Sequence, residues 1–431
     1  MEAGETNKEI EQILHPKKVI LNGQKVEALN DCFQACAVYD YSPKSDVELD
    51  LIRGDVLKIH EKTSEDWWWG EKDGAFGYIP VNHISTNFCK SGTEDWQDEH
   101  YYEIYSNIPL QLEMLSDKPR TLSYLKAIEE NKNFINGKSV MDVGCGTGIL
   151  SLFLAKHGNA AKVFAVEASG ASRIAESVVE FNGYHNKIQV LGKRVEDIET
   201  SEKMDLIISE WMGTLLLSEF MIDSVINARD KFLKPEGKIW PSTASLYFAP
   251  CSSNEEFQSK VTFWNDVYGF DFSEVKQIAL EQLTKKPLHN NITNKQNLLA
   301  NPEKIAELNM YTVAVEDIEN IVSHFTFKVE SPGLFDSFCT WFCVEFENFS
   351  KPGEKNIVLD TSPDAEITHW KHPLLLLDET TNVVNGDVIS GTIQLKRNEK
   401  LRRHMSLKLN VVITRSSEVL TQFEKEFKCW E

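Results

Sequence analysis

Residues 139–150, SVMDVGCGTGIL, constrain the fold of this chain more than any other stretch. An apolar strand breaks into a glycine turn that opens a helix, and strands then alternate with helices, as in a parallel, doubly wound sheet. Gly144, Gly146 and Gly148 let the backbone turn tightly and approach a ligand without steric penalty. Nicotinamide dinucleotide sites use a similar turn. However, these glycines are evenly spaced, unlike that fingerprint, and Asp142 precedes them where an acid can face an amino group.

A second acid follows the next expected strand. The run KVFAVE ends at Glu167, nineteen residues after Gly148, where a carboxylate can accept hydrogen bonds from both hydroxyls of a ribose. Strand, glycine turn, helix, strand and acid together resemble the class I S-adenosylmethionine-dependent methyltransferases. The resemblance implies that Asp142 through Gly148 cradle the donor and that Glu196 meets its adenine amino group. Without this context, Glu196 would be interpreted as a solvated acid.

The stretch SEWMGTLLLSEF, residues 209–220, encloses apolar side chains between Glu210 and Glu219. Carboxylates beside so much apolar surface carry a desolvation cost unless a cation meets them. The run MDLIISE places Glu210 at the carboxyl end of a sheet strand, which is the edge where ligands bind in open α/β sheets. An arginine side chain suits the pair, because its guanidinium stays charged and its donors can pair in parallel with each acid.

At this loop the sequence resembles the protein arginine methyltransferases, whose two-glutamate loop matches residues 210–219. The match extends to Tyr101, to EMLSDKPRT at residues 113–121 and to THW at residues 368–370, and covers about residues 100–431. It implies a catalytic set and a donor-binding set. The catalytic residues are Glu210, Glu219, His369 and Asp117, and the donor-binding residues are Tyr105, Gln111, Met114, Arg120, Asp142, Gly144, Gly146, Gly148, Glu167 and Glu196.

The resemblance also implies individual roles for these side chains. Arg120 is expected to clasp the α-carboxylate of the donor in a bidentate pair, while Tyr105 and Met114 cover the donor. His369 and Asp117 match a pair that handles protons. A structural bond that clamps the N-terminal helix over the donor explains this pair equally well.

Some positions bear on activity and product. Thr214 and Ser218 stand where relatives carry tyrosines, and Gln111 stands where a histidine is common. Fewer aromatic walls around the target arginine imply weak or selective activity. Met114 and Met221 match the methionines of family members that form asymmetric dimethylarginine, so this product is expected.

The implied architecture is a Rossmann-type domain at residues 101–243 followed by a β-barrel substrate domain at residues 244–431. Alternation in HFTFKVE and SLKLNVVIT favours antiparallel strands in the second half. Residues from about 255 to about 310 are expected to form an inserted helical arm, with FWNDVYGFDFSEV in the arm position, that makes a ring-shaped homodimer. A basic cluster predicts an exposed hairpin turn or, alternatively, a substrate-docking surface: Lys396, Arg397, Lys400, Arg402 and Arg403.

The N-terminal part consists of short β-type runs separated by turn residues. The order and spacing of AVYDY, ELDL, WWWG and GYIPVN within residues 31–88 resemble an SH3 domain, which binds polyproline II ligands in an aromatic groove. His83 replaces the tyrosine that usually follows Pro-x-Asn, so one groove wall is expected to be weakened. Trp68 alternates to the face opposite the groove, and either Trp68 or Trp69 could instead pack the small core. The implied groove residues are Tyr39, Tyr41, Trp67 and Pro80.

Charge and composition narrow the partners. The formal net charge of −21 argues against binding to nucleic-acid backbone or anionic membrane and favours basic partners, although it also serves solubility. Residues 1–30 are expected to be a flexible tail and residues 89–100 a linker. No signal-peptide core or membrane-length apolar run is present, so nucleus and cytoplasm are expected, and the cysteine spacing predicts no metal site.

Two hypotheses from different classes follow. The first is an arginine methyltransferase that uses S-adenosylmethionine, releases S-adenosylhomocysteine, and modifies histone tails or other Arg/Gly-rich proteins such as RNA-binding proteins. Its SH3 domain would recruit proline-rich partners. The alternative is an adaptor with little turnover, acting mainly through SH3 interactions. A small-molecule methyltransferase leaves the glutamate pair unexplained.

Overall fold

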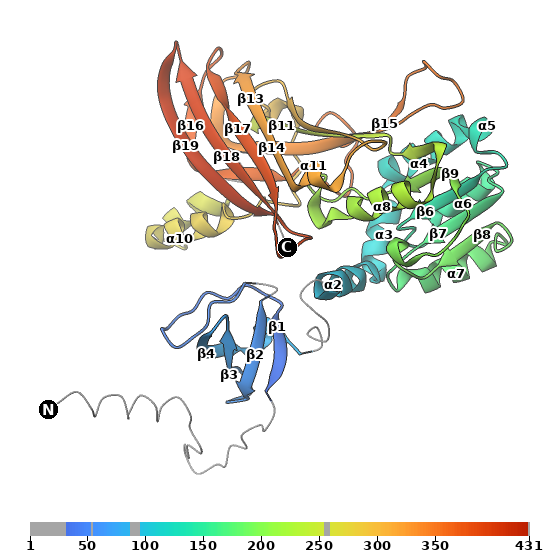
Figure 1. Ribbon diagram of the computed structural model, residues 1–431. Helices are drawn as coiled ribbons and strands as arrows, with labels where there is room; N and C mark the ends of the chain where they lie inside the picture. Colours follow the sequence, from blue (N-terminus) through green and yellow to red (C-terminus); the bar gives the residue numbers. More distant parts are fainter. Residues whose placement is uncertain (1–31, 53–54, 87–94, 254–258, 430–431) are drawn as a thin grey trace. The chain divides into compact units, whose positions relative to one another are not determined.

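The computed structural model describes residues 32–52, 55–86, 95–253 and 259–429, and contacts divide the chain into two units, residues 1–99 and 100–431 (Figure 1). The expected tail at residues 1–30 and the linker residues 89–94 lie outside the described residues. The rest of the expected linker is helical, because helix α2 (Asp95–Tyr105) begins six residues before Tyr101. Its sequence, DWQDEHYYEIY, has no Gly or Pro to stop the helix from extending toward its N-terminus. No helix within the described ranges is long and apolar enough to cross a membrane.

The first unit contains a five-stranded antiparallel sheet in the order β4-β3-β2-β1-β5. Alternation in VLKIHE turns Leu57 and Ile59 into a small core, which Trp68 joins from one face of its strand. The elements are β1 (Phe33–Ala37), β2 (Val56–Glu61), β3 (Trp67–Lys72), β4 (Ala75–Pro80), the 3₁₀ helix η1 (Val81–His83) and β5 (Ile84–Ser85).

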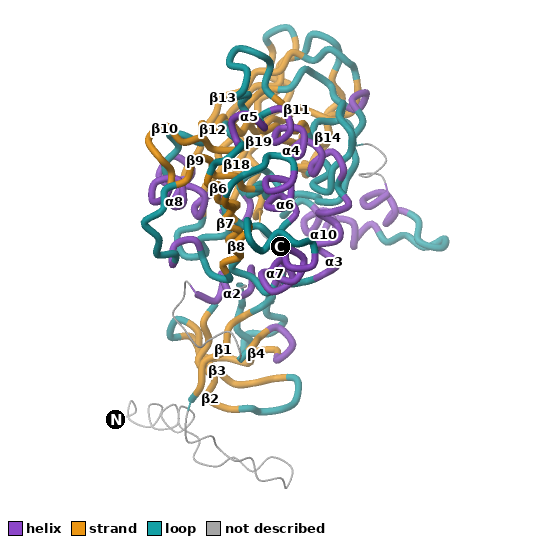
Figure 2. Tube along the Cα trace, turned by 90° about the vertical axis from the view of Figure 1, so that its right-hand side faces the viewer, coloured by secondary structure: helices purple, strands orange, loops and turns teal. Residues whose placement is uncertain are grey.

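The second unit begins with helices that precede a five-stranded parallel sheet in the order β10-β9-β6-β7-β8. Its central strands are almost entirely buried because helices cover both faces: α8 packs on one face and α6 on the other (Figure 2). The helices are α3 (Ile108–Ser116), α4 (Lys118–Glu130), α5 (Lys132–Ile135), α6 (Ile149–Lys156), α7 (Ala171–Phe181) and α8 (Ile222–Phe232). The strands are β6 (Ser139–Val143), β7 (Lys162–Val166), β8 (Ile188–Leu191), β9 (Met204–Ser209) and β10 (Leu233–Trp240), with the 3₁₀ helices η2 (Val195–Asp197) and η3 (Ser218–Phe220).

This strand order places a topological switch point between β6 and β9. The chain moves from β6 outward through β7 to β8 and then returns to β9 on the other side of β6. At such a point the connections leave the sheet in opposite directions and open a crevice at the carboxyl ends of the strands. The glycine turn follows β6 and Glu210 follows β9, so both lie at this crevice.

The second half is a β-barrel domain built from two antiparallel sheets. One has the order β12-β11-β14-β15 with β16 also on β14, and the other has the order β13-β17-β18-β19. Phe248 of β11 packs against Phe325 and Phe327 of β13 at ring distances of 5.1 Å, so the sheets share an aromatic core. The strands are β11 (Thr243–Cys251), β12 (Glu303–Asn309), β13 (Asn320–Lys328), β14 (Gly333–Phe346), β15 (Ile357–Asp360), β16 (Leu374–Val383), β17 (Val388–Arg397), β18 (Met405–Arg415) and β19 (Glu418–Cys429), with helix α11 (Val315–Glu319) before β13.

An insertion between β11 and β12 corresponds to the expected arm, part of which, residues 254–258, lies outside the described residues. It contains η4 (Thr262–Asn265), α10 (Ser273–Leu283) and η5 (Lys295–Asn297). The expected end at residue 310 is wrong. Glu303–Asn309 form strand β12, which pairs with β11, because Ile305 and Leu308 are buried in the core that the barrel shares.

Candidate active site

One cavity of about 290 Å³ lies at the carboxyl ends of β6, β7 and β9 within the second unit. Its walls come from α2, α3 and α4, from the loops after the three strands, and from barrel loops. Among the expected site residues, Asp117, Asp142 and Gly148 do not line it. Those that line it are Tyr105, Gln111, Met114, Arg120, Gly144, Gly146, Glu167, Glu196, Glu210, Glu219 and His369.

The glycine turn brings the backbone to the cavity wall. Gly144, Gly146 and Gly148 have φ values of 73°, 54° and 89°, in the left-handed region that favours glycine. A Cβ on Gly144 would collide with the side chain of Met221, and one on Gly146 would come within 3.0 Å of the Gln111 Oε1 atom. Gly148 is the N-cap of α6, and its contribution is therefore to the turn rather than to the cavity surface.

Glu167 joins the turn to the end of β7. Its Oε2 accepts a hydrogen bond from the Gly146 amide and its Oε1 one from the Ser169 amide, both at 2.8 Å. Each carboxylate oxygen can accept a further bond, which leaves capacity for the two hydroxyls of a ribose.

Glu196 offers an acceptor that protein groups leave largely unused. Its Oε1 accepts from the Ser224 hydroxyl at 2.7 Å. Its buried Oε2 has no hydrogen-bond partner among the described residues and lies 3.6 Å from Arg194 Nε. A buried acceptor of this kind fits a ligand amino group, because an unsatisfied buried polar atom is costly. The glycine turn, Glu167 and Glu196 therefore fit an adenosyl donor.

Asp142 lies behind the turn instead of facing a ligand in the cavity. It is completely buried, and its Oδ2 accepts from the Ser151 hydroxyl of α6 at 2.6 Å. Burial, which Ser151 only partly offsets, raises the pKa of this carboxyl to about 7. Its Oδ1 is buried without a hydrogen-bond partner among the described residues, so the expected approach to a donor amino group stays a prediction, while Oδ2 connects β6 to α6.

Glu210 already meets a cation. Arg120 of α4 donates from Nε and Nη2 to its Oε2 at 2.9 and 2.7 Å, and both side chains are 8 % exposed. Burial lowers the pKa of Arg120, but the charge of Glu210 and its hydrogen bond, together with smaller contributions from Tyr124 and Asp117, raise it by more, so the guanidinium stays charged. The side chain expected to clasp the donor's carboxylate thus also orients the first glutamate. Among the described residues, Oε1 of Glu210 accepts only from the Met212 amide, at 3.3 Å.

Glu219 is held in an unfavourable backbone conformation. Its φ is 70°, and Leu215, Leu216 and Phe220 of the same loop also have positive φ. Residues other than glycine rarely have a positive φ, and those that do cluster where the surrounding structure imposes this conformation. Tyr105 donates its hydroxyl to Glu219 Oε2 at 2.8 Å. Burial and then the charge of Glu219 raise the pKa of Tyr105 well above its usual value, so it remains a donor.

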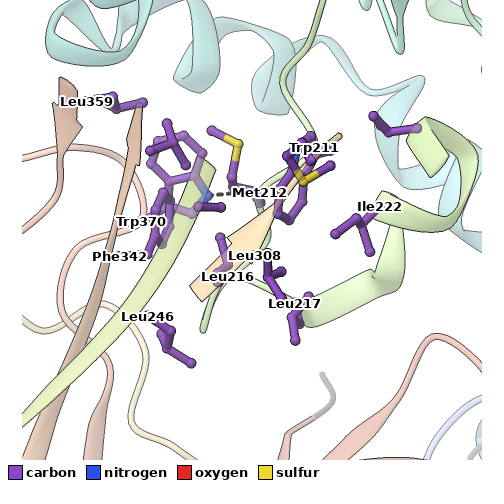
Figure 3. Close-up of a cluster of buried hydrophobic side chains, with 14 of the residues drawn as sticks. Trp211, Met212, Leu216, Leu217, Ile222, Leu246, Leu308, Phe342, Leu359 and Trp370 are labelled. Atoms are coloured by element: carbon purple, nitrogen blue, oxygen red, sulfur yellow. Dashed lines mark hydrogen bonds between the residues drawn. The ribbon is translucent and has the colours of Figure 1, made fainter. Parts of the chain in front are cut away.

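The underside of the two-glutamate loop packs on the barrel (Figure 3). Trp211, Met212, Leu216 and Leu217 are buried in one apolar cluster with barrel side chains such as Phe342. Trp370 of the THW stretch lies in the same cluster, and its Nε1 donates to the Met212 carbonyl at 2.8 Å. The two motifs expected at the site are therefore joined directly.

His369 and Asp117 form the expected pair. His369 Nδ1 lies 2.7 Å from Asp117 Oδ2, which also accepts from the His369 amide at 2.8 Å. Asp117 caps α4, since its Oδ1 accepts from the Arg120 amide at 3.0 Å. Burial raises the pKa of Asp117, but these bonds lower it by more, so the carboxyl is ionised. His369 lines the cavity, whereas Asp117 supports it from behind.

The expectation of an exposed basic turn is wrong for three of its five members. Arg397 is 5 % exposed and pairs with Asp223 and Glu319, and Arg402 also pairs with Glu319. Arg403 lines the cavity, and its Nη1 donates to the Glu219 carbonyl at 2.7 Å. Sequence reasoning missed this role because the partners lie at least 78 positions away, and a run of bases alone does not identify them.

The aromatic side chains expected in the SH3 groove lie together. Tyr41 contacts Trp67 at a ring distance of 5.9 Å, and His83 contacts Tyr41 at 5.2 Å and Tyr39 at 6.1 Å. Pro80 pairs with Trp67 across β3 and β4. His83 therefore occupies the wall where a tyrosine is usual. Burial, together with a hydrogen bond to Glu48, raises the pKa of Tyr41 to about 12.

Comparison with known proteins agrees with this geometry. Family models match residues 242–416 (arginine methyltransferase oligomerization subdomain), 36–81 (SH3 domain) and 117–243 (ribosomal protein L11 methyltransferase). Protein arginine N-methyltransferase 2 of Homo sapiens is 40% identical over 397 residues, 91% of this chain and 92% of that protein. Protein arginine N-methyltransferase 6 of Xenopus laevis is 41% identical over 320 residues, 74% of this chain and 92% of its own length.

Solved structures give the same result for the second unit. The Trypanosoma brucei PRMT1 enzyme-prozyme complex with AdoHcy matches with a TM-score of 0.69 and 29% identity, covering 76% of this chain and all of that one. Arabidopsis thaliana protein arginine methyltransferase 10 matches with a TM-score of 0.68 and 33% identity, covering 77% of this chain and all of that one. The chain therefore belongs to the protein arginine methyltransferase family and carries an SH3 domain in its N-terminal part.

Proposed function

We propose that this protein methylates arginine side chains of proteins in the cavity that contains Glu210 and Glu219, with S-adenosylmethionine as donor. One observation carries the proposal: both glutamates line the same cavity as the glycine turn, Glu167 and Glu196. A donor-binding wall and two carboxylates suited to a guanidinium thus share one cavity. The donor, when bound, supplies a methyl group activated by its positive sulfur.

The protein's own residues would prepare the guanidinium. Its delocalised charge makes the nitrogens poor nucleophiles. Carboxylates on two sides accept its N–H groups, hold the charge toward the bonded nitrogens, and leave the lone pair of the remaining nitrogen aimed at the methyl group. Alignment of this kind contributes up to about 7–11 kcal/mol. Arg120 orients Glu210, and Tyr105 orients Glu219.

Proton removal is assigned to His369 with Asp117. A methylated guanidinium must lose a proton, and His369 lines the cavity while Asp117 holds its Nδ1. This leaves Nε2 as the ring nitrogen available to accept a proton. The clamp interpretation has support as well, since the same bonds tie the THW loop to the N-cap of α4. A change in the pH profile of kcat in His369→Gln, with donor affinity unchanged, would favour proton transfer over a clamp.

The product proposed is asymmetric dimethylarginine. Met114 and Met221 both line the cavity, and Met221 lies beside Gly144 of the glycine turn. The test is incubation of the full chain with labelled S-adenosylmethionine and an arginine-rich peptide, with mass spectrometry that separates the two dimethylarginine isomers. Symmetric product would overturn this assignment. A folded protein that binds S-adenosylhomocysteine without methylating the peptide would instead support the adaptor, which Thr214 and Ser218 favour.

The substrate class is proposed from charge. The acidic chain, with a formal net charge of −21, suits Arg/Gly-rich substrates such as histone tails and RNA-binding proteins. We propose that the protein meets them in the nucleus and cytoplasm. Fractionated cells probed for the protein, followed by methylarginine profiling of each fraction after its removal, would test both statements.

The SH3 groove is proposed to bind proline-rich partners. Residues 31–88 carry eleven acidic and five basic side chains, a net charge of −6, so PxxP peptides flanked by arginine or lysine should bind best and weaken as salt rises. Trp67→Ala should abolish peptide capture and leave methylation of a short arginine-rich peptide almost unchanged. Phe76→Ala, which removes an exposed ring at the far end of the β3–β4 hairpin, is the matched control. Loss of peptide methylation in folded Trp67→Ala would contradict an independent recruiting module.

The inserted arm is proposed to form a homodimer. Tyr268 is 96 % and Phe270 69 % exposed, an unusual density of uncovered aromatic surface. A second copy that covers these rings would explain them. Sedimentation of Tyr268→Ser/Phe270→Ser should show monomers. Val419→Ser, at an exposed position on the β18–β19 side of the barrel, should leave the association state unchanged.

A further inference from the structure

Arg403 connects the barrel to the second glutamate. It lies in the turn between β17 and β18, and its Nη1 donates to the Glu219 carbonyl at 2.7 Å. The guanidinium carbon is 3.9 Å from the centre of the Tyr101 ring, within range of a cation–π contact. Tyr101 packs on Tyr105 at a ring distance of 4.7 Å, and Tyr105 donates to Glu219 Oε2. One guanidinium thus supports the backbone of Glu219 directly and its carboxylate through two tyrosines.

Glu219 needs such support. Its left-handed φ of 70° and the φ of 52° at Phe220 are unfavourable for side-chain-bearing residues. Such conformations persist only where the surrounding structure imposes them. The Arg403 bond holds the carbonyl that leads out of this strained position, and a charged donor makes that bond strong.

The position of Arg403 does not depend on Glu219 alone. Arg397 lies at the end of β17. Its guanidinium carbon is 4.0 Å from the centre of the Phe220 ring, and its guanidinium pairs with Asp223 of α8. Its Nε also donates to the Arg402 carbonyl, next to Arg403 in the chain. Arg402 pairs with Glu319 of α11. These ion pairs anchor the hairpin on both sides of the loop, so the Arg403 guanidinium approaches Glu219 from a fixed base.

We infer that Arg403 is a positioning residue for methyl transfer, which acts by fixing Glu219 rather than by binding the donor. This inference rests on the proposed function, since it assigns Glu219 to the target arginine. The β17–β18 hairpin then sets the orientation of Glu219, whereas Arg120 of the Rossmann-type domain sets the orientation of Glu210.

The test compares full-length Arg403→Ala, Arg403→Lys and Lys400→Ala. Lys400 lies in the same turn and is exposed. Arg403→Ala should lower kcat by about 10–100-fold, the size expected for loss of a charged hydrogen bond, with the Kd for S-adenosylhomocysteine within about twofold. Arg403→Lys should recover most of the rate, because lysine can still donate to the carbonyl and lie over the ring. Lys400→Ala should behave as the unchanged protein.

A double variant separates positioning from a general structural role. If Arg403 acts through Glu219, adding Arg403→Ala to Glu219→Gln causes no further loss of kcat. A kcat for Arg403→Ala within twofold of the unchanged protein, or additive losses in the double variant, would overturn the inference. If Arg403→Ala does not fold, Arg403→Gln takes its place in both comparisons.

A readout independent of turnover distinguishes failure of the inference from failure of the proposed function. Amide hydrogen exchange in residues 213–220 should be faster in Arg403→Ala than in Lys400→Ala, whether or not the protein methylates arginine. If the unchanged protein does not methylate arginine but exchange is faster in Arg403→Ala, the proposed function is refuted and the contact by which Arg403 fixes Glu219 still stands. Equal exchange in the two variants would show that Arg403 does not fix Glu219.

Discussion

Glu210 and Glu219 line one cavity, yet different parts of the molecule hold them. Glu210 directly follows β9, and its partner Arg120 belongs to a helix of the same Rossmann-type domain. Glu219 lies in a loop with a left-handed backbone, and its support comes from Tyr105 of α2 and from Arg403 in the barrel, 184 positions away. An acid at a strand end takes its position from the sheet, whereas an acid in a strained loop depends on contacts that the sheet does not supply.

Glu210 also has a different role from the one that its sequence suggested. A pair of glutamates suggested that both await one shared cation, but Glu210 Oε2 is already bonded to Arg120. Its Oε1 makes only a 3.3 Å bond to the Met212 amide and remains the better acceptor for a substrate. Glu210 would therefore bridge a permanent guanidinium and a transient one, while Glu219 presents a carboxylate oriented by a neutral hydroxyl.

The largest expected effect is common to both acids. Glu210→Gln and Glu219→Gln should each lower single-turnover rates by roughly 10²–10⁴, because each removes one partner of an ion pair formed in the transition state. Calorimetric titration with S-adenosylhomocysteine should show nearly unchanged donor affinity. Near-normal rates in both variants would contradict the assignment of the target arginine to this cavity.

Stability should separate the two acids. Glu210→Gln leaves the buried Arg120 guanidinium without its counter-charge, which costs about 3–5 kcal/mol and lowers the Tm of the catalytic unit by roughly 5–10 °C. Glu219→Gln should change Tm little, because an amide oxygen can still accept from Tyr105. Differential scanning calorimetry measures both. Arg120→Met/Glu210→Gln, which removes both charges, should regain part of the loss. Equal Tm values for the two single variants would contradict a stabilising ion pair at Glu210 alone.

A smaller effect is expected where the support of Glu219 is weakened without removing the acid. Tyr105→Phe deletes the 2.8 Å hydrogen bond to Oε2 and should lower kcat about 10–100-fold, since bonds to charged groups contribute about 1.5–3 kcal/mol. Tyr184→Phe, at a tyrosine that does not line the cavity, is the control. An unchanged kcat in Tyr105→Phe would show that Glu219 is positioned by its backbone alone.

The sequence predicted those parts of the site whose positions follow from local pattern. A glycine turn after a strand and acids at strand ends must meet at one edge of a parallel sheet, and Gly144, Glu167 and Glu210 do. The SH3 groove was predictable for the same reason, because strand alternation places Trp67 and Trp68 on opposite faces.

Contacts between distant segments were not predictable in this way. The basic cluster has the composition of a solvated turn, and only the fold shows that Arg397 meets Asp223 and Arg403 meets Glu219. The end of the arm was misplaced because residues 303–309 alternate too irregularly to be recognised without their partner strand β11. Likewise, the sequence position of Asp142 does not show that its Oδ2 accepts from Ser151.

The smallest expected effect concerns Asp142, a third acid whose neighbours all belong to the Rossmann-type domain. Burial raises its pKa from 3.8 to about 7 in the folded protein. Between these values the folded state binds the proton and the unfolded state does not, so stability falls as pH rises and levels off above about pH 7. Asp142→Asn keeps an oxygen for Ser151 but has no charge to bury. The Tm of Asp142→Asn minus the Tm of the unchanged protein should therefore increase by a few degrees as pH rises from about 4 to about 7.

Calorimetry of the donor-free protein across this range tests the sign as well as the size. Glu236→Gln, at an exposed position, serves as the matched control and should show no such trend. A Tm difference for Asp142→Asn that is constant with pH would mean that Asp142 ionises alike in both states, so its burial behind the glycine turn would not be complete in solution. If this Tm difference shrinks as pH rises, the folded protein stabilises the ionised Asp142 carboxylate. The end of β6 would then favour a cationic group, as the end of β9 does where Arg120 pairs with Glu210.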